Sequence, residues 1–257
     1  MTVPTGKRPR RSGAGPAPDL AALARPKLDA MAAAGDEVVE CVRVLAKTGD
    51  NIVGELLKTE ETFFEWDHYP KGDVYDPETH AQYYYHAHPA DARTGEHGHF
   101  HTFLRPAGMP PGVKPAPLHD YAPPADANDA LSHLVAISMD KYGLPTKLFT
   151  TNRWVTGETW YRAADVVAML DRFEMDLAQP SWPVNRWLTA MVRLFRPQIA
   201  ALLEQRDAAV AAWQASHREG NPYEDRALEV TSTLAISVDD QIRAVRAALK
   251  RAQIQRN

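Results

Sequence analysis

The sequence predicts an α+β fold in which a central antiparallel β-sheet of about four to six strands is flanked by N-terminal and C-terminal helices. Helical periodicity occupies residues 19–60, and it returns over residues 163–257. Between them, residues 61–162 hold short β-branched and aromatic runs separated by turns. Helices that bracket a run of strands are typical of this class. We expect residues 19–257 to form a single domain.

Composition excludes several classes of protein. The 257 residues are 44% hydrophobic and carry a net charge of −4, from 29 basic and 33 acidic side chains. This balance is ordinary for a globular protein and argues against a generally basic nucleic-acid binder. The single cysteine, Cys41, permits no internal disulfide, and no apolar run is long enough to span a membrane. We therefore expect a cytoplasmic protein without nucleic-acid or membrane partners, and we leave open whether it forms a homo-oligomer.

The N-terminal segment, residues 1–18, is basic. It contains Lys7, Arg8, Arg10 and Arg11 and no acidic residue before position 19. Such a segment buries too little apolar surface to fold, so we predict a disordered basic tail.

The first helical region begins near Asp19, which can cap a helix, and Pro26 indicates either a break or a late start. Apolar residues then recur at helical spacing, and residues 48–50 end one helix and begin another. The spacing is set by Val38, Val39, Val42 and Leu45.

Four runs in the middle of the chain are strand-like: residues 82–88, 97–104, 134–139 and 147–155. Turn-forming residues between the first two predict a β-hairpin. Residues 106–124 contain seven prolines, which excludes a regular element. We interpret this segment either as a lid or as an extended surface connection.

The C-terminal region is mainly helical. A long helical stretch covers residues 184–216, and Pro197 is expected to lie at the start of a second helix within it. Residues 228–236 are β-branched and are expected to return to the sheet as a strand, after which Ser237 caps a final helix.

Histidine is the unusual residue of this sequence: seven of the ten lie between His68 and His101. Side chains alternate between the faces of a strand, so the histidines within each strand of the hairpin share a face. If the numbers of opposed residues add to an odd sum, both sets point to the same side. A four-residue turn predicts such a register, with His88 opposite His99 and His86 opposite His101.

Clustered imidazoles predict a metal site, because neutral imidazole binds zinc, copper, iron and nickel. The predicted ligands are the five hairpin histidines, His86, His88, His97, His99 and His101, and the further candidates are His68, His80 and His133. By alternation Glu96 falls on the other face from His97, so we do not expect it to be a ligand. We expect Glu158 to be solvated; the alternative is a carboxylate that orients a ligand or acts as a general acid or base. The alternative is a histidine hydrogen-bond network or surface patch without a metal.

A histidine shell with open coordination positions favours a metal-dependent oxidoreductase that acts on a small molecule. Iron or copper is the first choice of metal and zinc the second, with zinc-dependent hydrolysis as the second reaction class. No catalytic residue is assigned. Two alternatives stay open: a non-catalytic protein that stores or senses a metal or binds haem, and a helical interaction protein with an incidental histidine patch.

Overall fold

The computed structural model describes residues 18–58, 60, 62–89 and 93–254, and it confirms the α+β class. The predicted tail lies outside the described residues except for residue 18. The six strands form one antiparallel sheet in chain order: β1 (Tyr69–Tyr75), β2 (Ala81–His86), β3 (Gly98–Leu104), β4 (Ser132–Met139), β5 (Pro145–Thr151) and β6 (Val230–Ala235). The α-helices are α1 (Arg25–Ala46), α2 (Ile52–Leu57), α3 (Arg153–Thr156), α4 (Ala163–Met169), α5 (Trp182–Leu194), α6 (Arg196–Ser216) and α7 (Val238–Ile254).

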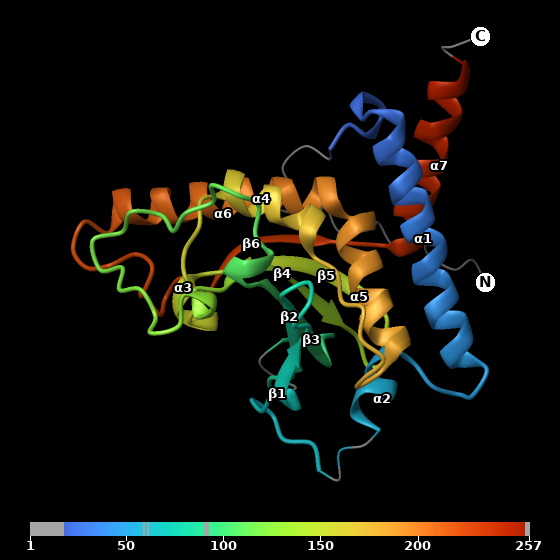
Figure 1. Ribbon diagram of the computed structural model, residues 1–257, viewed down its shortest axis with the longest axis horizontal. Helices are drawn as coiled ribbons and strands as arrows, with labels where there is room; N and C mark the ends of the chain where they lie inside the picture. Colours follow the sequence, from blue (N-terminus) through green and yellow to red (C-terminus); the bar gives the residue numbers. More distant parts are fainter. Residues whose placement is uncertain (1–17, 59, 61, 90–92, 255–257) are drawn as a thin grey trace, which may run out of the picture.

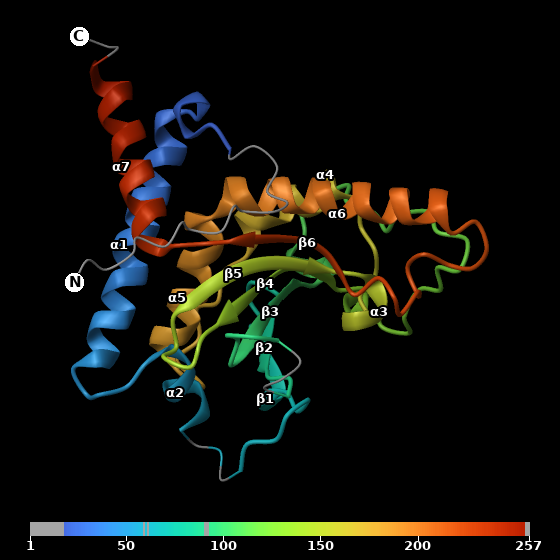
Figure 2. The same ribbon diagram turned by 180° about the vertical axis from the view of Figure 1, so that it is seen from behind.

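Helices cover one face of the sheet. Helices α4, α5 and α6 lie over it, and α1 packs against both α5 and α7 (Figures 1 and 2). The main hydrophobic core lies between these helices and the sheet, where the Phe100 ring is 5.8 Å from that of Trp187 on α5. The Tyr83 hydroxyl donates to Asn185 Oδ1 at 2.7 Å in the same core. In the described part of the chain, no helix combines the length and apolarity needed to cross a membrane.

The helix boundaries follow local capping chemistry. Asp19 caps a short 3₁₀ helix, Leu20–Ala22, and the chain breaks before α1, whose first turn holds Pro26; Pro197 lies in the first turn of α6. The second helix is capped by Asn51, whose Oδ1 accepts from the N–H groups of Val53 and Gly54, each at 3.0 Å. Ser237 Oγ accepts from the N–H of residue 240 at 3.2 Å, as expected for a cap.

The sequence prediction missed one strand and extended another too far. The first strand, β1, was not predicted, because Gly72 and Asp73 interrupt it with positive φ angles of 87° and 60°. An edge strand tolerates such an irregularity. The predicted strand over residues 147–155 ends at Thr151, because Asn152 Oδ1 accepts from the N–H of Arg153 at 2.9 Å and begins α3. The predicted return of the chain as β6 is confirmed.

The second face of the sheet carries the histidines and is also buried. Tyr84, His86, His99 and Phe149 are each at most 9% exposed. Residues from loops cover them: the Arg93 guanidinium lies 5.1 Å above the Phe149 ring. This face therefore forms a second, aromatic and polar interior.

Candidate metal centre

The β2–β3 hairpin brings the histidines together. The structure pairs His86 with His99 and Tyr84 with His101, so the numbers of opposed residues add to an odd sum. This confirms that His86, His99 and His101 share a face. The predicted partners were wrong by two residues.

The register differs because main-chain groups beside the turn of the hairpin bond to other segments. The Ala87 carbonyl accepts from the N–H of Trp66 at 2.9 Å, and the N–H of His97 donates to the Met139 carbonyl at 2.8 Å. Strand β2 therefore ends at His86 and β3 begins at Gly98, which leaves a longer connection than the four-residue turn that we predicted.

Three histidines form a group that could hold a metal ion: His86, His88 and His99. Each offers one ring nitrogen, and these atoms all lie within 4.8 Å of one another. His86 Nε2 and His99 Nε2 are 2.7 Å apart, and the His88 ring lies 5.0 Å from His86 and 5.2 Å from His99. A single ion could take the place of the proton in the hydrogen bond between His86 and His99 and also reach His88.

A buried carboxylate fixes the orientation of His99. The side chain of Glu96 is 4% exposed. Its Oε1 accepts from His99 Nδ1 at 2.7 Å, and its Oε2 lies 3.2 Å from Lys147 Nζ. Burial alone would raise the pKa of Glu96, but the hydrogen bond from His99 and the charge of Lys147 lower it to about 2. Because Glu96 is ionised and accepts from Nδ1, the lone pair of His99 is on Nε2 and points toward His86. A carboxylate behind a histidine ligand is the usual arrangement in protein metal sites.

Burial keeps the histidines neutral. Desolvation, together with the neighbouring rings of His99 and His88, lowers the pKa of His86 to about 2. Desolvation lowers the pKa of His99 to about 4, although Glu96 raises it, and it also lowers the pKa of His88. Neutral imidazoles have free lone pairs, which a metal requires.

A second histidine pair extends the cluster. His101 Nδ1 lies 3.0 Å from His133 Nε2, and the His101 ring is 4.8 Å from that of His99. A register shift between Thr102 and Phe103 places His133 opposite Phe103, on the histidine face. His101 Nε2 is buried and has no hydrogen-bond partner within the described chain. Burial lowers the pKa of His133 to about 3 and that of His101 well below its usual value.

The other predicted histidines lie apart from this group. His97 precedes β3, so strand alternation does not apply to it, and its Nδ1 lies 2.6 Å from the Tyr85 hydroxyl. His80 Nδ1 lies 2.6 Å from the Tyr75 hydroxyl. His68 is exposed and stacks on Tyr84. Its ring centroid lies 3.6 Å from that of Tyr84 and 5.8 Å from that of His86.

Glu158 is buried, so the expectation that it is solvated was wrong. It is 3% exposed, and its Oε2 accepts from the backbone N–H of His133 at 2.7 Å. Burial raises its pKa to about 7, although the charge of Arg206 opposes this. Glu158 therefore supports the main chain of β4 beside the histidine cluster.

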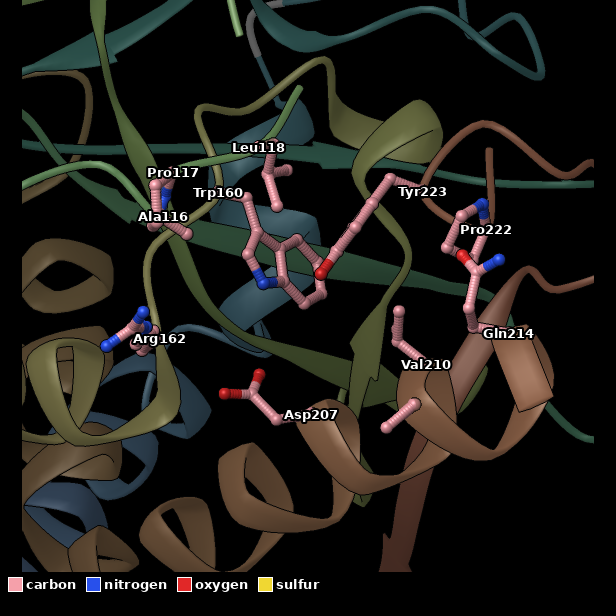
Figure 3. Close-up of a pocket in the computed structure, with 11 residues that line it drawn as sticks. Ala116, Pro117, Leu118, Trp160, Arg162, Asp207, Val210, Gln214, Pro222 and Tyr223 are labelled. Carbon is pink, nitrogen blue, oxygen red and sulfur yellow. The ribbon is translucent and has the colours of Figure 1, made fainter. Parts of the chain in front are cut away.

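Two cavities of the described chain differ in chemistry. One of about 320 Å³ lies against α6, with Trp160 and Tyr223 together on one side and Asp207 and Val210 on the other (Figure 3). The residues that line it include no histidine. Another, of about 530 Å³, has His88 and Glu96 in its wall and adjoins the candidate metal centre.

Comparison with known proteins identifies a family but no activity. The model of a family described as a domain of unknown function (DUF6969) matches residues 32–236. No curated protein and no solved structure matches the chain.

Proposed function

The chain belongs to the DUF6969 family of domains of unknown function, and from the site that it carries we propose that it is a metalloprotein and a metal-dependent oxidoreductase acting on a small molecule. The observation behind this proposal is the convergence of His86, His88 and His99 within 4.8 Å. Glu96 behind His99 completes the arrangement.

A metal explains this arrangement better than a hydrogen-bond network does. A hydrogen bond joins two nitrogens, as between His86 Nε2 and His99 Nε2, so three ring nitrogens that converge on one point cannot all be satisfied by one another. Protonation would supply donors, but burial holds the pKa of His86 near 2 and that of His99 near 4. A cation at the centre satisfies all three lone pairs at once.

The donor set favours a redox metal. Imidazole nitrogens suit iron, copper and zinc, and three of them leave coordination positions for other molecules. Bound iron or copper would supply one-electron and dioxygen chemistry. Zinc would supply hydrolysis with help from a nearby base, but the adjacent carboxylate, Glu96, is already engaged by His99 and Lys147. We therefore rank iron or copper first and zinc second.

A non-catalytic metal store or sensor is the second candidate. It is favoured by the additional buried pair, His101 and His133, because a catalytic ion does not need spare ligands. The close convergence of three rings argues for a bare ion and against haem, which is bound through only one or two axial side chains.

Elemental analysis of the untagged protein tests the proposal. We expect a near-stoichiometric transition metal in the wild type, its loss in His99→Ala, and its retention in the matched control His97→Ala, whose ring lies outside the group. Circular dichroism verifies that both variants are folded. No metal after reconstitution with iron(II), copper(II) or zinc(II), or equal loss in both variants, would refute the metal site. Oxygen consumption by the loaded protein then separates the oxidoreductase from the store or sensor.

A further inference from the structure

The cavity of about 530 Å³ shares residues with the metal centre. His88 is one of the three candidate ligands, and Glu96 holds His99, yet both also line this cavity. A molecule bound there contacts a ligand of the metal. The volume lies within the range of roughly 300–1,000 Å³ typical of small-molecule sites.

Aromatic side chains form the wall and rim of this cavity. Phe63 and Tyr142 line it and are 39% and 66% exposed. Phe64 and Trp66, on the same segment as Phe63, are 59% and 60% exposed. The rings of Trp66 and His88 meet edge to face, with their centroids 4.3 Å apart. Single exposed apolar residues are common, but a contiguous group beside a cavity marks a binding site.

The aromatic segment is held in place by the fold. The Phe63 ring stacks on Tyr69 at 4.9 Å, and its centroid is 5.7 Å from that of His97. The N–H of Phe64 donates to the Tyr69 hydroxyl at 2.5 Å. These contacts hold the aromatic segment against β1 and His97 at the edge of the cavity.

The charges around the cavity disfavour an anion. Glu96 is paired with Lys147, whose Nζ lies 3.2 Å away, and Arg93 is paired with Glu229, so these four charges cancel. The remaining charged groups of the wall are two carboxylates, Glu65 and Asp140, and one amine, Lys141. In the metal-free protein a ligand carboxylate or phosphate would therefore be repelled by a net negative wall. A neutral group would not be repelled, and a cationic group would be attracted.

We propose that this cavity is the substrate pocket of the candidate metal centre and takes a small aromatic molecule, and that in the metal-free protein its wall favours a ring that is neutral or carries an amine over one that carries a carboxylate or phosphate. Its description as a substrate pocket rests on the proposed function. The binding preference itself depends only on the walls of the cavity, so it can be measured on protein without metal.

The test uses three probes with the same ring and different charges: benzyl alcohol, benzylamine and benzoate. Binding to chelator-treated wild-type protein is measured by ligand-observed NMR and calorimetry. We expect benzyl alcohol and benzylamine to bind, and benzoate to bind at least tenfold more weakly. We expect Phe63→Ala and Tyr142→Ala each to weaken binding at least fivefold. Trp182→Ala is the matched control, because Trp182 is 54% exposed and lies outside the cavity wall.

Three results would overturn this assignment: benzoate binding as tightly as benzylamine, both cavity variants binding like wild type, or no probe binding at millimolar concentration. Sedimentation of the same samples shows whether the chain forms a dimer through this aromatic surface. A dimer that Tyr142→Ala dissociates would assign the aromatic surface to a second copy of the chain and refute the substrate pocket. Metal content is measured separately in Tyr142→Ala, so failure of the pocket and failure of the metal centre give different results.

Discussion

Lowering the pH from 7 to 5.5 is expected to destabilise the metal-free protein through its buried histidines. Desolvation places the folded-state pKa of His86 near 2, that of His133 near 3 and that of His99 near 4, all below the value of 6.5 for an exposed histidine. As pH falls below 6.5, the unfolded chain binds protons that the folded protein does not, so the free energy of unfolding decreases.

The magnitude follows from these pKa values. Between pH 7 and 5.5, each of the three histidines removes a little over ~1 kcal/mol, or ~4 kcal/mol together. Glu158 acts in the opposite direction, because its folded pKa is raised to about 7 and its stabilising protonation increases as pH falls. That gain is ~2 kcal/mol over the same window. The net loss is therefore ~2 kcal/mol, and His101 adds to it in the same direction.

Urea unfolding at pH 7.0, 6.5, 6.0 and 5.5 in the presence of a chelator measures this effect. The variant His133→Gln should show a smaller loss of stability between pH 7 and 5.5 than the wild type, because it removes one buried titrating group. The control His217→Gln should match the wild type, because His217 is exposed. A free energy of unfolding that stays constant over this range, or a His133→Gln variant with the wild-type slope, would refute the reasoning.

Three further predictions concern single side chains. Glu96→Gln should lower metal affinity by ~10–100-fold, measured by competition with a chelator, because the carboxylate no longer fixes His99; Glu65→Gln is the control. Gly98→Ala should destabilise the protein by ~2–3 kcal/mol in urea unfolding, because a Cβ there would lie 2.5 Å from the His86 carbonyl oxygen. Tyr83→Phe should cost ~1–3 kcal/mol in the same assay, because it removes the donor to buried Asn185.

Periodicity in the sequence was enough to predict the arrangement of most elements. The apolar spacing around Val38 and Leu45 predicted α1, and the β-branched run near Val230 predicted the last strand. Parity along β2 and β3 was also enough to put His86, His99 and His101 on one face, because the predicted and observed registers differ by two residues and so leave the same side chains on the same face.

Contacts between distant segments could not be read from periodicity. The end of β2 depends on a hydrogen bond from Trp66, and the start of β3 depends on one to Met139, so the register was outside the reach of local turn rules. The pairing of His101 with His133 requires a register shift between β3 and β4. The prediction applied strict alternation to His97, which lies one residue before the start of β3, although alternation holds only within the strand.

The two carboxylates show a related limit. Glu96 lies in a connection that turns back toward β3, so its side chain reaches His99 three residues later. The sequence offered one signal for this contact, a glutamate three residues before a histidine in a turn. Glu158 had no comparable signal, because its burial depends on the packing of Arg206 and β4 around it.

The buried histidines also predict how metal affinity depends on pH. In a solvent-exposed site, each ligand with a pKa of 6.5 loses ~8-fold in its neutral fraction between pH 7 and 5.5, so three ligands lose ~500-fold in metal affinity. Here the pKa values of His86 and His99 lie near 2 and 4, so these ligands are already neutral at pH 5.5. Desolvation also lowers the pKa of His88.

The affinity of the folded protein for zinc(II) should therefore change less than ~10-fold between pH 7 and 5.5, because at most one of the three ligands, His88, still titrates there. Equilibrium dialysis followed by elemental analysis measures it, and circular dichroism confirms that the protein stays folded at the lower pH. A loss of several hundred-fold would mean that protons reach the ligands freely in the folded state. The three rings would then not form a site that burial shields from protons.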